Sequence, residues 1–354
     1  RGDQSKELLN GGQFRNRNSL LGDIINSNPL FVGAQDYGYA LGSSGLSSAE
    51  KSSYLSFRNS SAYLKRVDAV SPTAMIYVGA NDGMLHGFLA KTGEEVFAYV
   101  PNEVYSNLSA LTSPLYSHKY YVDGSPKVID AYVSSSWKTV LVSSVGAGGN
   151  SVFAIDITDP QSITAGNVMW EFSNADLGLV SQAAVGRLSN GNWVAIVSNG
   201  YNSVDGRAKL LIINLSNGQL LKTIDTGVGT VADPNGLGLP LVVDTNNDRI
   251  IDFVYAGDQQ GNMWKFDLTG SIGEWGIPVK SGNIVKPLFI ACDSYNVNGQ
   301  CLSTNSRQPI TARPIAISHP AGGVMLLFGT GSYFLTEDMN ALNRKEAVYG
   351  VRDN

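Results

Sequence analysis

The sequence has little charge and few histidines. Charged residues make up 16% of its 354 residues, and the formal net charge is −5, whereas an average soluble protein has about 25% charged residues. Nucleic-acid binding depends on clustered Lys and Arg that contact phosphates, so this composition argues against nucleic acid as a partner. The three histidines, His86, His118 and His319, are scattered, and we interpret each as structural because no two have the close spacing of metal ligands.

Long hydrophobic runs are also absent. No segment approaches the roughly 18 to 20 consecutive apolar residues of a membrane-spanning helix, so no transmembrane segment is predicted. The chain begins at Arg1 without a Met, a basic region or an apolar leader, and we interpret it as a processed piece or an excised domain. The hydrophobic fraction of 43% is sufficient for a folded core and excludes a disordered chain.

Only two cysteines are present, Cys292 and Cys301, in one polar loop. Two thiols alone are too few for a zinc site. We predict a disulfide that closes this loop in an oxidising compartment, and the alternative is two unrelated free thiols. A neutral surface rich in Ser, Asn and Gly agrees with a secreted β-protein.

The sequence shows no convergent set of acid, base and nucleophile, so no enzymatic activity is predicted. The glycine-rich segment Ser144–Gly149 lacks the Lys-Ser/Thr pair of a phosphate-binding loop, and we interpret it as a hairpin turn. Arg1-Gly2-Asp3 spells an integrin-recognition tripeptide. Three residues match by chance often, so an integrin partner is the weakest of the predictions.

The sequence does contain an internal repeat. A small or Pro-containing entry followed by an apolar run occurs five times, at Asn28–Val32, Ser125–Ile129, Gln182–Val185, Leu239–Val243 and Arg313–Ile317. Further β-rich runs follow the entries, as Trp193–Val197, Leu210–Asn214 and Leu220–Ile224 do in the third unit. Four short strands per unit predict an all-β fold, a β-propeller of four-stranded antiparallel blades.

The expected organisation is one propeller domain over 1–354, or most of one. It comprises an N-terminal strand region (1–34), a partly helical insertion (35–70) and five blade-like units at approximately 71–122, 123–176, 177–230, 231–308 and 309–354. Ser48 is the expected cap of a helix that runs to about Lys65. The last unit has no obvious outer strand, so either the N-terminus closes the ring or the chain is part of a longer propeller.

The segment Asp244–Asp252 predicts a calcium site. Oxygen donors occur at the loop positions that bind calcium in an EF-hand, and they are Asp244, Asn246, Asp248, the backbone carbonyl of Ile250, and Asp252. Two positions differ, because Arg249 replaces the usual Gly and Tyr255 replaces the bidentate Glu. The flanking segments read as strands rather than helices. The alternative is an Asp- and Asn-rich hairpin turn without a metal.

Several longer sequence segments resemble those of a known family. They are Leu21–Pro29, Tyr77–Phe88, Tyr120–Pro126, Gly146–Gly149 with Asp156–Pro160, and Phe328–Phe334. In this order they closely resemble the C-terminal propeller of the PilC/PilY family of type IV pilus-associated tip adhesins. Propellers of that family usually have about seven blades, so the resemblance implies that the chain is part of a larger, modified ring.

The resemblance implies a function as well. It implies a calcium loop that looks like Asp244–Asp252, whose occupancy tunes pilus extension against retraction, twitching motility and surface attachment. It also implies an extracellular location, at the pilus tip or bacterial outer surface after export through the periplasm. The implied partners are pilins and minor pilins of the pilus machinery, and a host-cell or abiotic surface.

Two other functions remain open. Phe88–Glu95 also resembles blade motifs of pyrroloquinoline-quinone dehydrogenases, which bind a quinone and calcium on the propeller axis. Those enzymes often use adjacent cysteines, whereas the two cysteines here are separated. The other alternative is a scaffold propeller with a structural calcium site and no role in pili.

Overall fold

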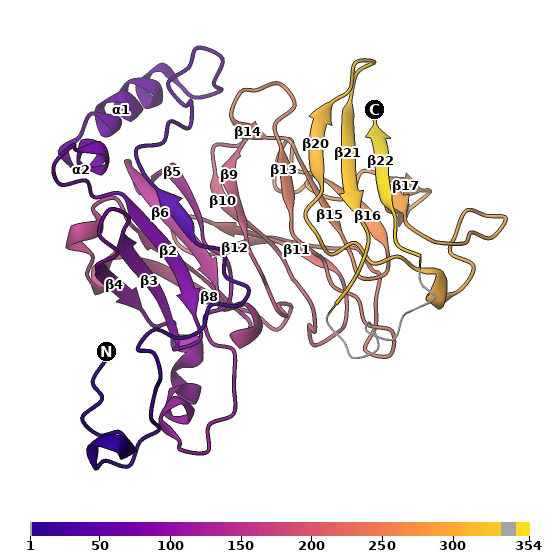
Figure 1. The fold of residues 1–354 in the computed structure, drawn as a ribbon. Coiled ribbons are helices and arrows are strands. Elements are labelled where there is room, and N and C mark those ends of the chain that lie inside the picture. Colours follow the sequence, from indigo (N-terminus) through magenta and orange to yellow (C-terminus); the bar gives the residue numbers. More distant parts are fainter. Residues whose placement is uncertain (1, 334–344) are drawn as a thin grey trace.

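The computed structural model describes residues 2–333 and 345–354. Five sheets follow one another in chain order along an arc (Figure 1), and their strands are antiparallel except where β14 (Ile250–Ile251) joins the third sheet in parallel. The first is β1 (Leu30–Val32), β2 (Met75–Ala80), β3 (Met84–Leu89) and β4 (Glu95–Tyr99), and the second is β5 (Lys127–Val133), β6 (Ser136–Ser144), β7 (Ser151–Asp156) and β8 (Val168–Ser173). The third is β9 (Ala184–Leu188), β10 (Trp193–Ser198), β11 (Lys209–Asn214) and β12 (Leu220–Asp225).

The fourth sheet has a two-residue outer strand, and the fifth sheet has three strands in the described residues. The fourth is β13 (Leu241–Val243), β15 (Phe253–Gly257), β16 (Asn262–Asp267) and β19 (Phe289–Ile290), and the fifth is β20 (Ile315–Ser318), β21 (Val324–Gly329) and β22 (Val348–Asp353). A small hairpin, β17 (Lys280–Ser281) and β18 (Ile284–Val285), precedes β19. The predicted all-β propeller of four-stranded antiparallel blades is confirmed.

The hydrophobic runs of the repeat form the core between neighbouring blades. Every residue of β10 is buried, from Trp193 to Ser198, because both faces of this central strand are covered by other sheets. Its alternate residues divide between two clusters: Ala195 packs toward the second blade, whereas Val194 and Ile196 pack toward the fourth. A continuous apolar run is what a strand buried on both faces requires.

The hairpin turns have the backbone that short β-connections need. Ser134 and Ser135, between β5 and β6, both have positive φ, at 51° and 64°. Two consecutive residues of this kind make a type I′ turn, whose twist matches that of the two flanking strands.

The segment between β1 and β2 contains two helices and is anchored on the second blade. Helix α1 (Ser48–Arg58) begins after Ser47, whose side chain forms a capping box with Glu50. The predicted cap at Ser48 is therefore wrong by one residue, and the predicted single helix is two, because the chain turns at Asn59 before α2 (Ser61–Leu64). The hydroxyls of Tyr54 and Tyr63 donate to the buried carboxylate of Asp130 on β5.

Short 3₁₀ segments occupy the connections. They are η1 (Leu8–Asn10), η2 (Lys65–Val67), η3 (Asn102–Thr112), η4 (Gly146–Gly148), η5 (Pro160–Ser162), η6 (Ala165–Asn167) and η7 (Thr304–Ser306). None of the helices in the described ranges is both long and apolar enough to cross a membrane.

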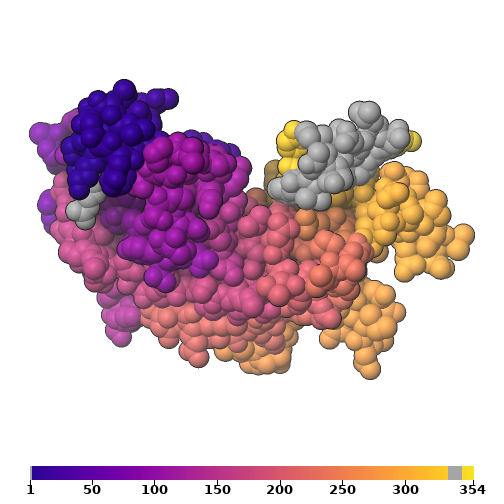
Figure 2. All heavy atoms as spheres, turned by 90° about the horizontal axis from the view of Figure 1, so that it is seen from below, coloured from indigo at the N-terminus to yellow at the C-terminus, as the bar shows by residue number. Residues whose placement is uncertain are grey.

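The two ends of the arc differ from its middle. The N-terminal segment protrudes at one end, and the fifth sheet lies at the other (Figure 2). On the fifth sheet, Ile315 is 62% exposed and Val348 is 83% exposed. The fifth sheet therefore keeps an apolar face in solvent that the middle sheets bury.

Candidate metal loop and its surroundings

The Asp244–Asp252 loop lies where two blades and the insertion meet. It joins β13 to β15 within the fourth blade. Inside it, β14 (Ile250–Ile251) pairs in parallel with β9 of the third blade. The backbone N–H of Gly45, in the insertion, donates to the carbonyl of Asp248 at 2.7 Å. The loop is thus fixed to three parts of the chain at once.

Arg249 has the backbone conformation of the glycine that it replaces. Its φ is +69°, and that of Asn247 is +61°. Both residues lie in the left-handed region, which glycine adopts freely and most other residues adopt at a cost. Arg249, at position six of the loop, therefore differs from the EF-hand glycine in its side chain and not in its backbone conformation.

The carboxylates of Asp244 and Asp248 turn inward to the loop backbone. Asp244 Oδ1 accepts from the N–H groups of Asn246 and Asp248, both at 3.2 Å, and Oδ2 accepts from that of Arg249 at 2.8 Å. Asp248 Oδ1 accepts from the N–H of Ile250 at 2.8 Å. The residues predicted as ligands thus share one turn, and their oxygens organise it.

The carboxylate of Asp252 accepts its hydrogen bonds from Thr245. Its Oδ2 accepts from the backbone N–H of Thr245 at 2.8 Å and from the hydroxyl of the same residue. Within residues 2–333 and 345–354, no three His, Cys, Asp or Glu side chains are grouped so that they could hold a metal ion. In the same ranges, none of the three loop carboxylates forms an ion pair. The loop offers only oxygen donors, the type that calcium prefers.

A second carboxylate in the same blade, that of Asp258, accepts several hydrogen bonds from the protein. Asp258, in the turn between β15 and β16, is buried with 0% exposure. It accepts from Asn235 Nδ2 and Trp264 Nε1, both at 2.8 Å, and from the backbone N–H groups of Gln260 and Asn262 at 2.9 Å. This saturated network makes Asp258 a structural residue, which the Asp244–Asp252 pattern did not anticipate.

Cys292 and Cys301 form a disulfide. Their Cα atoms are 5.4 Å apart, within the usual range for such a bond. The disulfide closes the loop after β19, and the described residues contain no free cysteine.

His86, on β3, lies between two carboxylates. Its Nδ1 is 2.5 Å from Glu95 Oε1, and its Nε2 is 3.1 Å from Asp82 Oδ1. Burial of the ring lowers its pKa, but the hydrogen bonds and charges of Asp82 and Glu95 outweigh burial and leave the pKa raised. The arrangement fits the structural role expected of this histidine.

A family model described as the PilY1 beta-propeller domain matches residues 21–354. The chain belongs to this family. The PilY1 homolog of Xylella fastidiosa, named a type IV pilus biogenesis factor, is 41% identical over 372 residues, and PilY1 of Pseudomonas aeruginosa strain PAK is 39% identical over 367. Both alignments cover the whole of this chain.

A solved structure shows the same fold. The crystal structure of the Pseudomonas aeruginosa PilY1 C-terminal domain superposes with a TM-score of 0.70 at 33% identity, over 91% of this chain and 64% of that one. The chain spans 24% of the Xylella relative and 30% of the PAK relative. It thus matches only part of each of these relatives, and the predicted resemblance to the PilC/PilY family is confirmed.

Proposed function

We propose that this propeller is a calcium-responsive domain of a type IV pilus biogenesis factor and tip adhesin. It would act outside the cell, at the pilus tip or the bacterial surface, with pilins and minor pilins as partners. Calcium binding would regulate pilus extension and retraction, twitching motility and attachment to host or abiotic surfaces. The membership of the PilY1 family and the relatives' names supply the pilus association.

One observation supports the calcium part of the proposal. Three carboxylates lie within nine residues and have no cationic partner in the described ranges. The ligands would be the side-chain oxygens of Asp244, Asn246, Asp248 and Asp252 and the carbonyl of Ile250. The ion would supply the positive charge that offsets their repulsion, and calcium suits an irregular set of oxygens better than magnesium does.

The position of the loop offers a route from calcium to regulation. A ligand shifts a conformational equilibrium only by its differential affinity for the two states. The loop contacts β9 through β14 and the insertion through Gly45, so a change at the carboxylates would alter how these parts are held. The proposal requires no catalysis, and a quinoprotein enzyme is not part of it.

An integrin contact through Arg1-Gly2-Asp3 is also left out of the proposal. Arg1 lies outside the described residues. The carboxylate of Asp3 accepts from the backbone N–H of Ser5 at 2.8 Å, which gives this short motif no feature that points to a receptor.

The first prediction tests the metal. Asp252→Ala removes one carboxylate, and we expect calcium affinity in calorimetry to fall by at least about tenfold, which corresponds to about 1.4 kcal/mol. Asp267→Ala is the matched control, because Asp267 also accepts from the N–H and hydroxyl of one threonine, Thr269. Equal affinity in the wild type and Asp252→Ala would refute the calcium site.

The same pair tests the regulation in cells. In the full-length protein, Asp252→Ala should change the number of surface pili or twitching motility, while Asp267→Ala should not. If a strain exports the Asp252→Ala protein at the wild-type level, and that protein no longer binds calcium, yet piliation, motility and adhesion are normal, then the regulatory part of the proposal is wrong.

A further inference from the structure

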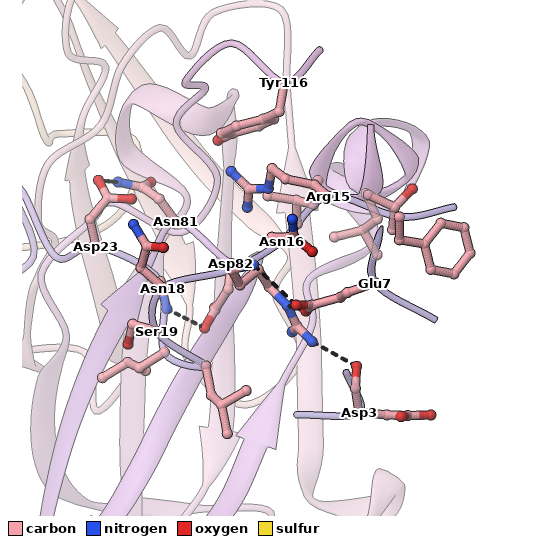
Figure 3. A pocket seen from close by; sticks show the side chains of 18 of the residues that line it. Asp3, Glu7, Arg15, Asn16, Asn18, Ser19, Asp23, Asn81, Asp82 and Tyr116 are labelled. Atoms are coloured by element: carbon pink, nitrogen blue, oxygen red, sulfur yellow. Dashed lines mark hydrogen bonds and ion pairs between the residues drawn. The ribbon is translucent and has the colours of Figure 1, made fainter. Parts of the chain in front are cut away.

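A second candidate site lies beneath the first blade, away from the calcium loop. It is a pocket of about 840 Å³ between the N-terminal segment (residues 3–23), the β2–β3 turn and η3 (Figure 3). This volume is typical of sites that hold a small ligand. Leu108 and Leu111 of η3 supply apolar lining, and the N-terminal segment and the turn supply polar groups.

The walls of the pocket are fixed to one another. The N–H of Arg15 donates to the carbonyl of Thr112 at 2.9 Å, and the N–H of Gly22 donates to Asp82 Oδ2 at 2.8 Å. Asn81 donates from its backbone to the carbonyl of Asp23 at 3.0 Å. Because these hydrogen bonds hold the N-terminal segment at Arg15, Gly22 and Asp23, the pocket is formed without a ligand.

The carboxylates around the pocket already have partners. Glu7 pairs with Arg17 at 2.6 Å, and Asp23 pairs with His118 at 2.8 Å. Asp82 accepts from Gly22 and contacts His86, as described above. These acidic groups are therefore engaged by the protein itself.

Arg15 is different, because no acceptor in the described residues contacts its side chain. Its guanidinium carbon lies 4.1 Å from the centre of the Tyr116 ring. Its Nε is buried and makes no hydrogen bond, and within residues 2–333 and 345–354 the side chain pairs with no carboxylate. Figure 3 shows the guanidinium beneath Tyr116, facing into the pocket. A stacked guanidinium of this kind is pre-organised to bind a carboxylate through two N–H groups.

The remaining polar lining is suited to hydroxyl groups. The amides of Asn16 and Asn18 and the hydroxyl of Ser19 line the pocket. In the described part of the chain, the amide nitrogen of Asn16 and the side chains of Asn18 and Ser19 make no hydrogen bond. Amides and hydroxyls both donate and accept, as sugar hydroxyls do. The walls are mainly loops and turns and present no strand edge to which an extended peptide could add.

We propose that this pocket binds an acidic saccharide, with the sugar carboxylate on Arg15, the ring hydroxyls on Asn16, Asn18 and Ser19, and the apolar ring face toward Leu108 and Leu111. Uronic acids of polysaccharides and sialic acids of glycoconjugates share this chemistry. The site is independent of the calcium loop, so Asp252→Ala should leave its affinity unchanged.

The test measures binding of defined sugars by calorimetry or NMR titration. Tri-galacturonic acid and N-acetylneuraminic acid represent the two sources, and maltotriose is the neutral control. We expect at least one acid to bind, with an affinity at least about tenfold above that of maltotriose. Because the contact is ionic, the affinity should fall as salt rises. Equal binding of acidic and neutral sugars, or no binding of either acid, would overturn the proposal.

Variants and a modified ligand locate the contact. Arg15→Gln should weaken acid binding at least about tenfold, whereas Arg58→Gln, on α1, should not change it. If Arg15→Gln does not fold, the methyl ester of the sugar acid provides the same test on the wild-type protein and should bind as weakly as maltotriose. Unchanged affinity of the folded Arg15→Gln variant or of the ester, or binding of an Asp/Glu peptide but of no saccharide, would contradict the site.

Discussion

Two acidic turns of the fourth blade flank the strand β15, and their carboxylates differ in burial and in hydrogen-bond partners. One turn contains Asp258, and the other contains Asp244 and Asp248. Asp258 is buried and accepts hydrogen bonds from side chains and backbone on several segments. Asp244 and Asp248 accept chiefly from the backbone of their own loop. The first turn is complete without a ligand, whereas the second concentrates negative charge at the surface. Acidic sequence alone does not distinguish the two.

Burial explains the difference between the two turns. A buried carboxylate needs all its hydrogen bonds from the protein, because leaving it or its donors unpaired is costly. A surface carboxylate is hydrated by solvent and has no such requirement, so its oxygens can bind a ligand. The same contrast recurs in the pocket, where Glu7 and Arg17 pair with each other, whereas Arg15 has no ion pair within residues 2–333 and 345–354.

The largest effect is expected at the buried turn. Asp258→Ala would leave Asn235, Asn262 and Trp264 with buried, unpaired donors, and we expect the free energy of unfolding to fall by about 3–5 kcal/mol. Chemical denaturation of the purified domain would measure it. Asp267→Ala, at the other end of β16, should cost less than about 1 kcal/mol, because its hydrogen bonds are exposed. Equal losses would show that the burial of Asp258 does not set the cost of removing its carboxylate.

The two turns also differ in how well the sequence predicted them. Loop positions 244–252 were identified because their donors lie close together along the chain. Asp258 was not, since one of its partners, Asn235, comes from a preceding loop. Arg15 and Tyr116 are likewise far apart in sequence and meet only because η3 lies against the N-terminal segment.

Among the strands too, those with a local sequence signal were predicted and those formed by long-range pairing were not. Hydrophobic runs with turn residues between them located blade strands such as β10 and β11, because both signals are local. The short strand β19 was missed, since its two residues carry no repeat and it forms by pairing with β16. Pairing of β14 with β9 was missed for the same reason.

A smaller effect is expected at Arg249 in the surface loop. Arg249→Gly removes the positive charge of the residue that follows Asp248 in the sequence and a strained backbone conformation, which costs roughly 1–2 kcal/mol for a residue other than glycine. Calcium affinity and stability should both rise. Arg249→Asn separates the two causes, because Asn is neutral and tolerates positive φ. If neither variant binds calcium more tightly, the guanidinium does not act on the site.

The smallest effect is expected where a carboxylate turn has a charged partner, at Asp82 and His86 in the first blade. The raised pKa of His86 means that the folded protein holds the ring proton more tightly than the unfolded chain does. Its contribution to stability is therefore fully present below the ordinary pKa of about 6.5 and is lost as the pH rises through the raised value.

Comparison of the wild type with His86→Gln across this range isolates that contribution. Glu95 is 48% exposed on its side chain, so solvent screens part of the interaction, and we expect the pH-dependent difference to be less than about 1 kcal/mol. The unfolding free energies of the two proteins, measured from pH 6 to pH 9, should differ most at the acidic end. His319→Gln is the control, because His319 contacts no carboxylate in the described ranges. A difference that is constant with pH would mean that His86 stabilises the blade by packing against Phe88 and not by its charge.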